Sequence, residues 1–406
     1  MKEGLLSYII NLFKVLFTKG LVIIIGFLNS IIIARCLGVE GQGQYALAMT
    51  IYSVGFQFIN MGLHSAHTYY LAKDPNKISV VFGNSIGITC VSFVLCMIIN
   101  YIFALGKFEV GLPYEALCIS FYLIPCYLYY YLQYQTLLVM DKILVLSVLD
   151  IIIVLFPFIG NLLLYIGGIE SILAVLGLLL CSYLIVDIFG LVYILGIHVK
   201  PKISIKFYCK CIKLGIVVSL ACFLGYLVLR VDIFMIQAML GGEDTGIYSL
   251  AANLVEIVNT FAATCTMVMF PKATAIQDKE LRYKFTTRIL KIISFCMIVI
   301  LVVGEVLSGY LIPLVYGESF VATVKVFRIL LIGIIFWGLA GIPISYYTTE
   351  KRYGISFVSY AVAFLLNVVL NFWWIPKYGV IGAAFTSVIS YFIVLVMTLA
   401  YYIKKK

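Results

Sequence analysis

The feature that most constrains this chain is a segment that occurs twice, half a chain apart. Residues 37–48 match residues 240–251 at a constant offset of 203, with Leu-Gly, Glu, Gly, Tyr, Leu and Ala in the same order and spacing. Each copy follows one apolar run and opens another. Such a repeat in an apolar chain predicts a membrane protein built from two like halves, an arrangement typical of transporters.

The composition excludes a soluble fold. Of the 406 residues, 64% are hydrophobic and only 11% are charged, whereas soluble domains carry about 25% charged residues. Lipid must therefore be the solvent for most of the surface. A membrane-spanning helix needs roughly 20 residues, so about twelve spans account for nearly the whole length and leave no room for a soluble catalytic domain.

The predicted fold class is an all-α integral membrane protein with two six-helix lobes. Because the repeat offset covers six helices, the lobes should be parallel repeats related by an axis along the membrane normal. The basic loop near 197–213 separates the predicted domains 1–200 and 201–406. The apolar runs and their interrupting residues predict helices near 12–34, 44–70, 78–105, 113–138, 143–166, 170–196, 208–231, 246–270, 287–312, 321–347, 355–375 and 380–403.

The distribution of positive charge predicts the orientation. An even number of spans places both termini on one side, and a cytoplasmic N-terminus puts most of the 28 Lys and Arg residues, including Lys404 to Lys406, in inner segments. The exceptions are Arg35, Lys107, Arg230, Lys325, Arg328 and Lys377. This asymmetry also explains the net charge of +10 without a nucleic-acid partner. The first apolar run lacks a small-residue cleavage site, which indicates a retained first helix.

The chain shows no enzyme motif, and we expect neither a catalytic residue nor a cofactor. It contains no zinc-protease H-E-x-x-H, phosphate-binding Walker A loop, G-x-S-x-G or paired C-x-x-C. Three histidines, eleven scattered cysteines and a lone C-x-C at 209–211 make a weak case for a metal site, so none is predicted. Without a nucleotide site, transport would draw on an ion gradient or on the gradient of the substrate.

Charged residues inside predicted helices are the candidates for function. Arg230, Asp232 and Glu256 lie in the seventh and eighth helices, and Arg35 ends the first. Each charge at the bilayer centre costs about 2.5–3.5 kcal/mol on insertion scales and needs a partner, water or a function. Asp232 matches Asn29 in the repeat, which suggests that the repeated helices line a gap between the halves. The alternative is a packing ion pair of Arg230, with Glu256 favoured because side chains at i, i+2 point to different helix faces.

Three further carboxylates are candidates for ion coupling. Asp150, Asp187 and Glu305 lie in the fifth, sixth and ninth predicted helices. Desolvation favours the protonated form of such a group, so each could bind a proton or a cation. The alternative for each is a solvated or hydrogen-bonded side chain. Lys19, near the inner end of the first helix, either extends to lipid headgroups or forms a basic entrance to the transport path.

Polar and aromatic clusters allow two interpretations as well. His64 and His67 share a helix face and serve either as a proton relay or glycan contact or as interface residues. Five tyrosines at 127–134 belong either to an aromatic belt or to a surface on which sugar rings stack. Asn367 and Asn371, one helical turn apart, predict hydrogen bonds between helices.

The repeat and the charged helices resemble a known family. Residues 35–45 read Arg-Cys-Leu-Gly-Val-Glu-Gly-Gln-Gly-Gln-Tyr, similar to the R-x-L-G-x-x-G-x-G-x-Y signature of Wzx-type polysaccharide flippases. Residues 230–232, 246–251 and 378–384 resemble the same family. It belongs to the multidrug/oligosaccharidyl-lipid/polysaccharide exporter superfamily. The resemblance covers essentially the whole chain, and its motifs mark the superfamily better than the substrate.

The resemblance implies a twelve-helix, two-lobed bundle with a V-shaped central cavity. Proteins of this type carry an undecaprenyl-diphosphate-linked oligosaccharide, such as an O-antigen or capsule unit, across the bacterial inner membrane. The implied partners are this lipid-linked substrate, membrane lipids, H⁺ or Na⁺ as a coupling ion, and oligosaccharide polymerase machinery.

Together these considerations assign a substrate site. Cationic side chains would offset the charge of the diphosphate, and the neighbouring polar groups would orient them. The predicted substrate-binding residues are Arg35, Arg230, Lys19, Asp232, Glu256 and Asn29. One alternative is a cation-coupled multidrug exporter of the same superfamily, which would place acidic residues at the centre. Another is a membrane-embedded polymerase or glycosyltransferase, which would need a longer outer loop than any predicted here.

Overall fold

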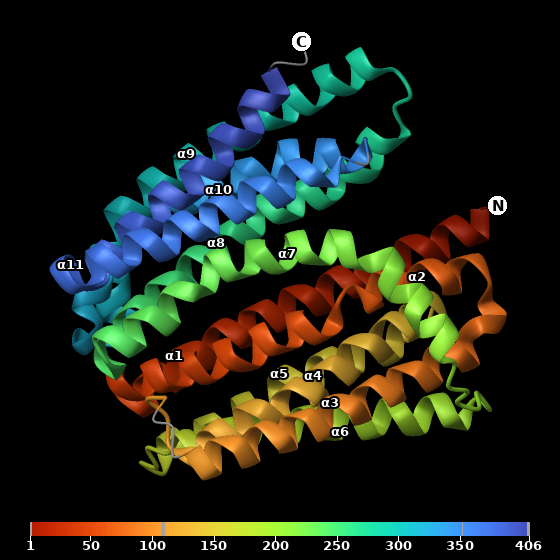
Figure 1. Cartoon of the computed structure of the whole chain (residues 1–406), viewed down its shortest axis with the longest axis horizontal. Helices are drawn as coiled ribbons and strands as arrows, with labels where there is room; N and C mark the ends of the chain where they lie inside the picture. The colour runs from red at the N-terminus through yellow and green to blue at the C-terminus, as the bar shows by residue number, and fades with distance from the viewer. Residues whose placement is uncertain (1, 107–109, 351, 404–406) are drawn as a thin grey trace. The chain divides into compact units, whose positions relative to one another are not determined.

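The structure, a computed structural model, describes residues 2–106, 110–350 and 352–403, with no account of the side chains of residues 2–17 and 217. Lys107 and Lys404 to Lys406, used in the charge tally, lie outside these ranges. The chain forms two compact units (Figure 1): unit 1 comprises 1–38 and 48–219, and unit 2 comprises 39–47 and 220–406. The domain boundary at residue 200 stays a prediction.

The described residues are almost entirely helical. The elements are α1 (Lys2–Asn60), α2 (Leu63–Lys73), η1 (Pro75–Lys77), α3 (Ile78–Gly106), α4 (Tyr114–Val139), α5 (Ile143–Ile166), α6 (Ile172–Gly196), α7 (Ile205–Met239), α8 (Gly242–Ala275), α9 (Lys279–Tyr316), η2 (Glu318–Phe320), α10 (Val321–Thr349) and α11 (Tyr353–Ile403). Non-helical glycines divide α1 at Gly38 and α11 at Gly379. Counting α2 as the continuation of the second part of α1, the described chain forms the twelve predicted helices, and the all-α fold class is confirmed.

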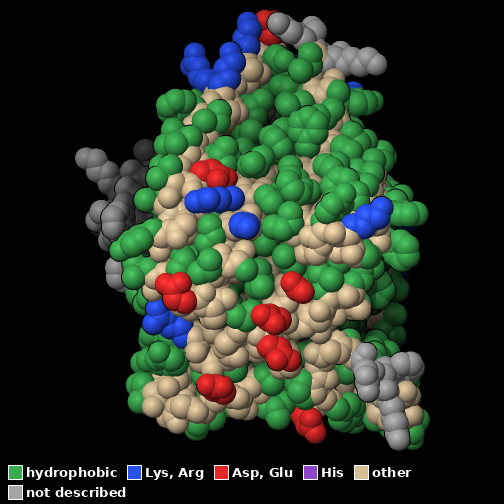
Figure 2. Space-filling model, turned by 90° about the vertical axis from the view of Figure 1, so that its left-hand side faces the viewer, with side chains coloured by type: hydrophobic (Ala, Val, Ile, Leu, Met, Phe, Trp, Pro, Cys, Tyr) green, Lys and Arg blue, Asp and Glu red, His purple; other side chains and the backbone are tan. Residues whose placement is uncertain are grey.

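Among the described residues, nine helices are long and apolar enough to cross a membrane. Two of these nine, Thr18–Asn60 and Tyr353–Ile403, each contain a dividing glycine and therefore two spans. The 26-residue α4 is long enough but falls outside this group, because its tyrosines and glutamines lower its hydropathy. Figure 2 shows one face of the molecule, on which separate charged side chains lie among hydrophobic ones.

The turns on one side of the predicted membrane share a backbone device. Six turns, at the ends predicted to face outward, contain a glycine with positive φ, which a residue without a Cβ adopts readily. In chain order they are Gly38, Gly111, Gly168, Gly241, Gly317 and Gly379. The last three follow the first three by 203, 206 and 211 residues. The two halves therefore repeat their turn geometry as well as their sequence.

The two copies of the sequence repeat pack against each other within unit 2. A Cβ on Gly43 would lie 2.0 Å from the carbonyl oxygen of Gly242, and one on Gly246 would lie 1.9 Å from that of Val39. The contact is reciprocal, because each copy presents its glycine to the backbone of the other. The second part of α1 thus crosses α8 at backbone contact, which explains why 39–47 belongs to unit 2.

Each unit has its own helix packing. In unit 1, α4 contacts α2, α3, α5 and α6. In the core of this unit, the rings of Phe56 and Tyr127 pack edge to face with their centres 4.4 Å apart. In unit 2, α10 packs against α8, α9 and α11, which run beside it in Figure 1. The helices α4 and α10 therefore lie at the packing centres of their units.

The predicted helix over 44–70 is interrupted, which corrects the sequence analysis. Met61 and Gly62 have positive φ values of 39° and 74°, and α2 begins after them. A Cβ on Gly62 would meet Ser219 Oγ at 2.2 Å and the Gly215 backbone at 3.0 Å. The chain therefore breaks where it approaches α7 too closely for a side chain, a tertiary constraint that the apolar pattern does not reveal.

Other helix ends differ from the predicted ones, because an apolar run marks the part of a helix that lies in the bilayer and not the whole helix. The break predicted between residues 375 and 380 lies at Gly379, and the preceding helix continues through Pro376, as membrane helices tolerate proline. Helix α9 begins eight residues before its apolar run. The Asp278 carboxylate caps it by accepting a hydrogen bond from the Leu281 N–H at 3.0 Å, which lowers the pKa of Asp278.

Adding a methyl group at the crossing should destabilise unit 2. Gly43→Ala forces the α1 and α8 backbones apart, and overpacking of this kind costs about 1–3 kcal/mol. Thermal unfolding of the detergent-purified protein should show a lower midpoint. Gly26→Ala, in the first part of α1 with no atom within 4 Å of its added Cβ, is the control. Equal midpoints for the two variants would contradict the close crossing.

Candidate functional site

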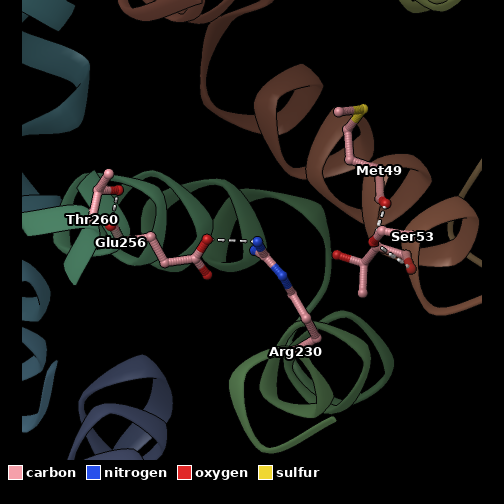
Figure 3. Close-up of polar contacts among 6 residues, drawn as sticks. Met49, Ser53, Arg230, Glu256 and Thr260 are labelled. Atoms are coloured by element: carbon pink, nitrogen blue, oxygen red, sulfur yellow. Dashed lines mark hydrogen bonds and ion pairs between the residues drawn. The ribbon is translucent and has the colours of Figure 1, made fainter. Parts of the chain in front are cut away.

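An intramembrane ion pair in unit 2 joins α7 and α8. The Arg230 guanidinium donates to Glu256 Oε2 at 2.7 Å, and the two side chains are 17% and 29% exposed (Figure 3). The guanidinium also lies 5.6 Å from the centre of the Tyr226 ring, a cation–π distance. The structure forms the pair that the helix geometry favoured in the sequence analysis. Both side chains keep partial exposure.

Asp232, two residues from Arg230, belongs to a different, buried network. Its side chain is 1% exposed. Tyr248 on α8 donates to Oδ2 at 2.6 Å, and Asn371 and Ser387 on α11 donate to Oδ1 and Oδ2. The bond from Asn371 to Asp232 joins α11 to α7, which confirms the hydrogen bond between helices predicted for Asn371. Asn371 also donates to Asn367 Oδ1 at 2.9 Å within α11, so the corresponding role of Asn367 stays a prediction. The carboxylate thus ties together three helices of unit 2, and its geometry is that of a packing centre.

The same helix positions are linked in unit 1 by neutral groups. Asn29, the repeat equivalent of Asp232, accepts a hydrogen bond from Asn161 on α5 at 3.0 Å. Asn161 precedes Asn371 by 210 residues, close to the repeat offset. The first and fifth helices of each half are therefore bridged at matching places, with an amide pair in one unit and an amide–carboxylate pair in the other.

A second ion pair lies inside unit 1. Lys19 Nζ on α1 is 2.6 Å from Asp150 Oδ2 on α5, and the other carboxylate oxygen accepts from Tyr130 at 2.7 Å. Lys19 also lies 5.1 Å from the centre of the Tyr134 ring. Its side chain is 47% exposed, whereas that of Asp150 is 7% exposed. The structure therefore joins a predicted substrate residue to a predicted ion-coupling residue, and the cation keeps access to the surroundings.

The other two coupling candidates differ in their partners. Glu305 lies 3.7 Å from the Arg328 guanidinium, with both side chains partly exposed. Asp187 on α6 is buried and accepts a hydrogen bond from Gln133 Nε2 on α4 at 3.2 Å. In the described residues, Asp187 forms no ion pair. It is therefore a buried carboxyl group supported by a neutral amide.

The remaining candidates are placed as follows. Arg35 is exposed and lies three residues before the turn at Gly38. The His64 ring shares hydrogen bonds with Asn60 at 2.9 Å and Ser65 at 2.8 Å, and the His67 ring is fully buried. Within the ranges that the structure covers, no group of three His, Cys, Asp or Glu residues could hold a metal ion.

Sequence reasoning missed the neutral partners of the carboxylates. Tyr130 and Gln133 look like two more residues of an aromatic helix, and Ser387 lies in a small-residue run. Gln133 could have been identified as a polar side chain on a helix that faces an acidic one. Nothing in the local sequence points Tyr130 and not Tyr129 toward Asp150.

Comparison with known proteins decides the family. The model of the family described as "Polysaccharide biosynthesis protein" matches residues 11–277, about two thirds of the chain. The chain belongs to this family. The resemblance read from residues 35–45 and from the charged helices is thereby confirmed.

Two curated proteins match part of the chain. A Shigella flexneri protein named "Putative O-antigen transporter" is 26% identical over 155 residues, 38% of this chain and 37% of that protein. The Staphylococcus aureus protein "Capsular polysaccharide biosynthesis protein CapF" is 29% identical over 189 residues, 44% and 46% of the two chains. The matches span less than half the length of these relatives.

Solved structures share the fold over nearly the full chain. The "Lipid II flippase MurJ, inward closed conformation" aligns with TM-score 0.79 and 18% identity, over 97% of this chain and 87% of that one. An inward-facing multidrug transporter of the MOP superfamily aligns with TM-score 0.70 and 12% identity, over 93% and 94%. The chain therefore has the fold of that superfamily and is a multi-pass membrane protein.

The buried network around Asp232 predicts a difference between two buried tyrosines. Tyr248→Phe removes a hydroxyl that donates to a carboxylate and should lower the free energy of unfolding of the protein by about 1–2 kcal/mol. Tyr129→Phe removes a buried hydroxyl that has no hydrogen-bond partner among the described residues, so it should be near neutral. Denaturant or thermal unfolding in detergent measures both. A Tyr129→Phe loss as large as that of Tyr248→Phe would show that the network does not stabilise unit 2.

Proposed function

We propose that this protein carries an undecaprenyl-diphosphate-linked oligosaccharide, an O-antigen or capsule unit, from the inner to the outer leaflet of the bacterial inner membrane. The family supports the link to polysaccharide synthesis. The names of the two curated relatives point to O-antigen and capsule, and the fold is that of a lipid flippase. Transport would proceed by alternating access, with both termini in the cytoplasm.

The observation that carries the proposal is the partly exposed Arg230–Glu256 pair within the membrane-spanning part of unit 2. A guanidinium held at 2.7 Å by a single carboxylate keeps further donors for a second anion. A diphosphate accepts such donors in bidentate geometry. In the free protein Glu256 neutralises Arg230, and in the complex the diphosphate would share or replace that contact. The cation is thus tolerated in the bilayer both with and without substrate.

The Lys19–Asp150 pair in unit 1 would bind the diphosphate in the same way as the Arg230–Glu256 pair, but less strongly. The Lys19 ammonium is a compact charge that is held by Asp150 and lies near the Tyr134 ring, and it retains exposed surface. Lys19 would therefore offer the diphosphate a further cation within unit 1. Arg35, exposed beside the turn at Gly38, would offer another at the predicted outer end of its helix. Neutral amides such as Asn29 would form hydrogen bonds with the glycan.

A transport assay tests the role of Arg230. We expect Arg230→Ala to lower head-group translocation by tenfold or more, because a hydrogen bond to a charged group contributes about 1.5–3 kcal/mol and about 1.4 kcal/mol corresponds to tenfold. The measurement is the rate at which a labelled lipid-linked oligosaccharide crosses the membrane of proteoliposomes containing equal amounts of folded protein.

The control is Arg328→Ala, which removes an arginine from the looser Arg328–Glu305 pair of the same unit. This variant should transport normally. Normal transport by Arg230→Ala would refute the assignment of Arg230 to the diphosphate. Efflux of cationic dyes without oligosaccharide transport by the wild-type protein would instead identify a multidrug exporter.

For ion coupling, we propose a proton on Asp187. Asp150 pairs with Lys19 and Glu305 with Arg328, so Asp187 is the predicted coupling residue that lacks a cation among the described residues. Its hydrogen bond comes from an amide N–H, and the site offers few oxygen ligands for a hard metal ion. A proton needs only the carboxyl group of Asp187, whereas a metal ion would need several further oxygen ligands.

Asp187→Asn tests this role, because an amide cannot take up the proton. We expect transport by the variant to become independent of an imposed pH gradient while substrate binding persists. Translocation in proteoliposomes with and without the gradient is the measurement, and Glu305→Gln is the control. A variant that still responds to the gradient as the wild type does would place the coupling group elsewhere.

A further inference from the structure

A positively charged hollow lies at one end of unit 2, away from the ion pair of Arg230. It has a volume of about 940 Å³ and is formed by the start of α9 and the end of α10. The charged side chains that line it are Lys279, Glu280, Lys284, Arg288, Lys291 and Glu350. This end of α9 is predicted to face the cytoplasm, because positive residues accumulate there.

The cations of this hollow are only partly neutralised. Lys284 pairs with Glu280 at 2.6 Å, and Glu350 lies 3.5 Å from Arg352. For the other three cations, the described part of the chain contains no ion pair. They are Lys279, Arg288 and Lys291. All three side chains are exposed, so the hollow presents an excess of positive charge.

The wall behind these cations is rigid. Tyr283 on α9 stacks on Tyr402 of α11 with ring centres 4.6 Å apart. The Tyr402 hydroxyl contacts the Thr287 hydroxyl at 3.0 Å and donates to the Tyr283 carbonyl oxygen at 3.1 Å. Tyr346, from α10, meets Tyr402 edge to face at 5.2 Å. The start of α9 is therefore fixed to both neighbouring helices, which sets the spacing of its cations in advance.

An exposed apolar stripe continues from the cations along the same helix. Residues spaced by three or four positions lie on one helix face, and five hydrophobic side chains follow this spacing. They are Ile292 (53% exposed), Phe295 (69%), Val299 (46%), Val302 (58%) and Val306 (71%). Helix α9 thus presents positive charge at one end and hydrocarbon contact over about four turns.

We propose that this hollow binds the phosphate headgroup of an anionic membrane lipid whose hydrocarbon chain lies along the α9 stripe. Arginine and lysine bind phosphate oxygens, and juxtamembrane cations attract the anionic lipids of the cytoplasmic leaflet. A merely solvated basic face would not need the aromatic and hydrogen-bonded wall behind its cations. The ligand class is a phosphate ester on a long hydrocarbon chain, either a phosphatidylglycerol-type lipid or a prenyl phosphate.

The test is lipid retention by the full-length protein. Native mass spectrometry of the purified protein would count molecules that remain bound after exchange into detergent containing phosphatidylglycerol, undecaprenyl phosphate, phosphatidylcholine or inorganic phosphate. We expect retention of one or both of the first two. Preference for one identifies its source, and equal retention shows that the headgroup charge decides. Equal retention of phosphatidylcholine would overturn the charge argument, and equal binding of inorganic phosphate would overturn the role of the chain.

Variants locate the site. Arg288→Glu with Lys291→Glu should lower anionic-lipid affinity by about tenfold or more, given the strength of such contacts. The milder pair Arg288→Gln with Lys291→Gln should show a smaller loss while keeping the fold, which size-exclusion chromatography checks. The matched control is Lys200→Glu, just before α7, with Lys206→Glu in the first turn of α7, which makes the same charge change in another basic segment. Equal losses in this control and in the α9 variants would mean a diffuse electrostatic effect and would refute the site.

Discussion

A lipid bilayer offers almost no hydrogen bonds, and this one constraint governs both the fold and the candidate site. Backbone N–H and C=O groups must be satisfied within each span, so the described chain is helical nearly throughout. Each charge that enters a span must find a partner: Arg230 finds Glu256, and Lys19 finds Asp150. Asp232 is satisfied by three neutral donors. The candidate site residues and the packing residues therefore meet the same requirement, in one case with an oppositely charged partner and in the other with a network of neutral donors.

The two halves share a backbone plan and differ in their chemistry. Glycines with positive φ recur at the equivalent turns, and the amide bridge between Asn29 and Asn161 corresponds to the bridge between Asp232 and Asn371. The ion pairs, however, occupy different helices, α1 with α5 in unit 1 and α7 with α8 in unit 2. The duplicated scaffold therefore carries ion pairs at different helix positions in its two units.

Much of the fold could be predicted from the sequence, and less of the candidate site. The span of α5 coincides with its predicted range because both ends carry turn signals, whereas the interruption at Gly62 escaped because it follows from the approach of Gly215 on α7. The acidic and basic site residues were found because charge is conspicuous in an apolar helix. Their partners Tyr130, Gln133 and Ser387 were not, because a neutral polar side chain has no fixed meaning until the facing helix is known.

The sequence by itself determined that this protein lives in a membrane, that it is built from a repeated set of helices, and that a few charges lie within them. These properties follow from composition, periodicity and self-similarity, which each segment carries on its own. Only the tertiary structure decided which charge is held by which partner, since the contacts of Asp232 with α11 join residues 139 and 155 positions apart. It also decided that the two copies of the repeat meet at Gly43 and Gly246, because backbone contact between helices depends on their crossing in space and not on the order of their residues.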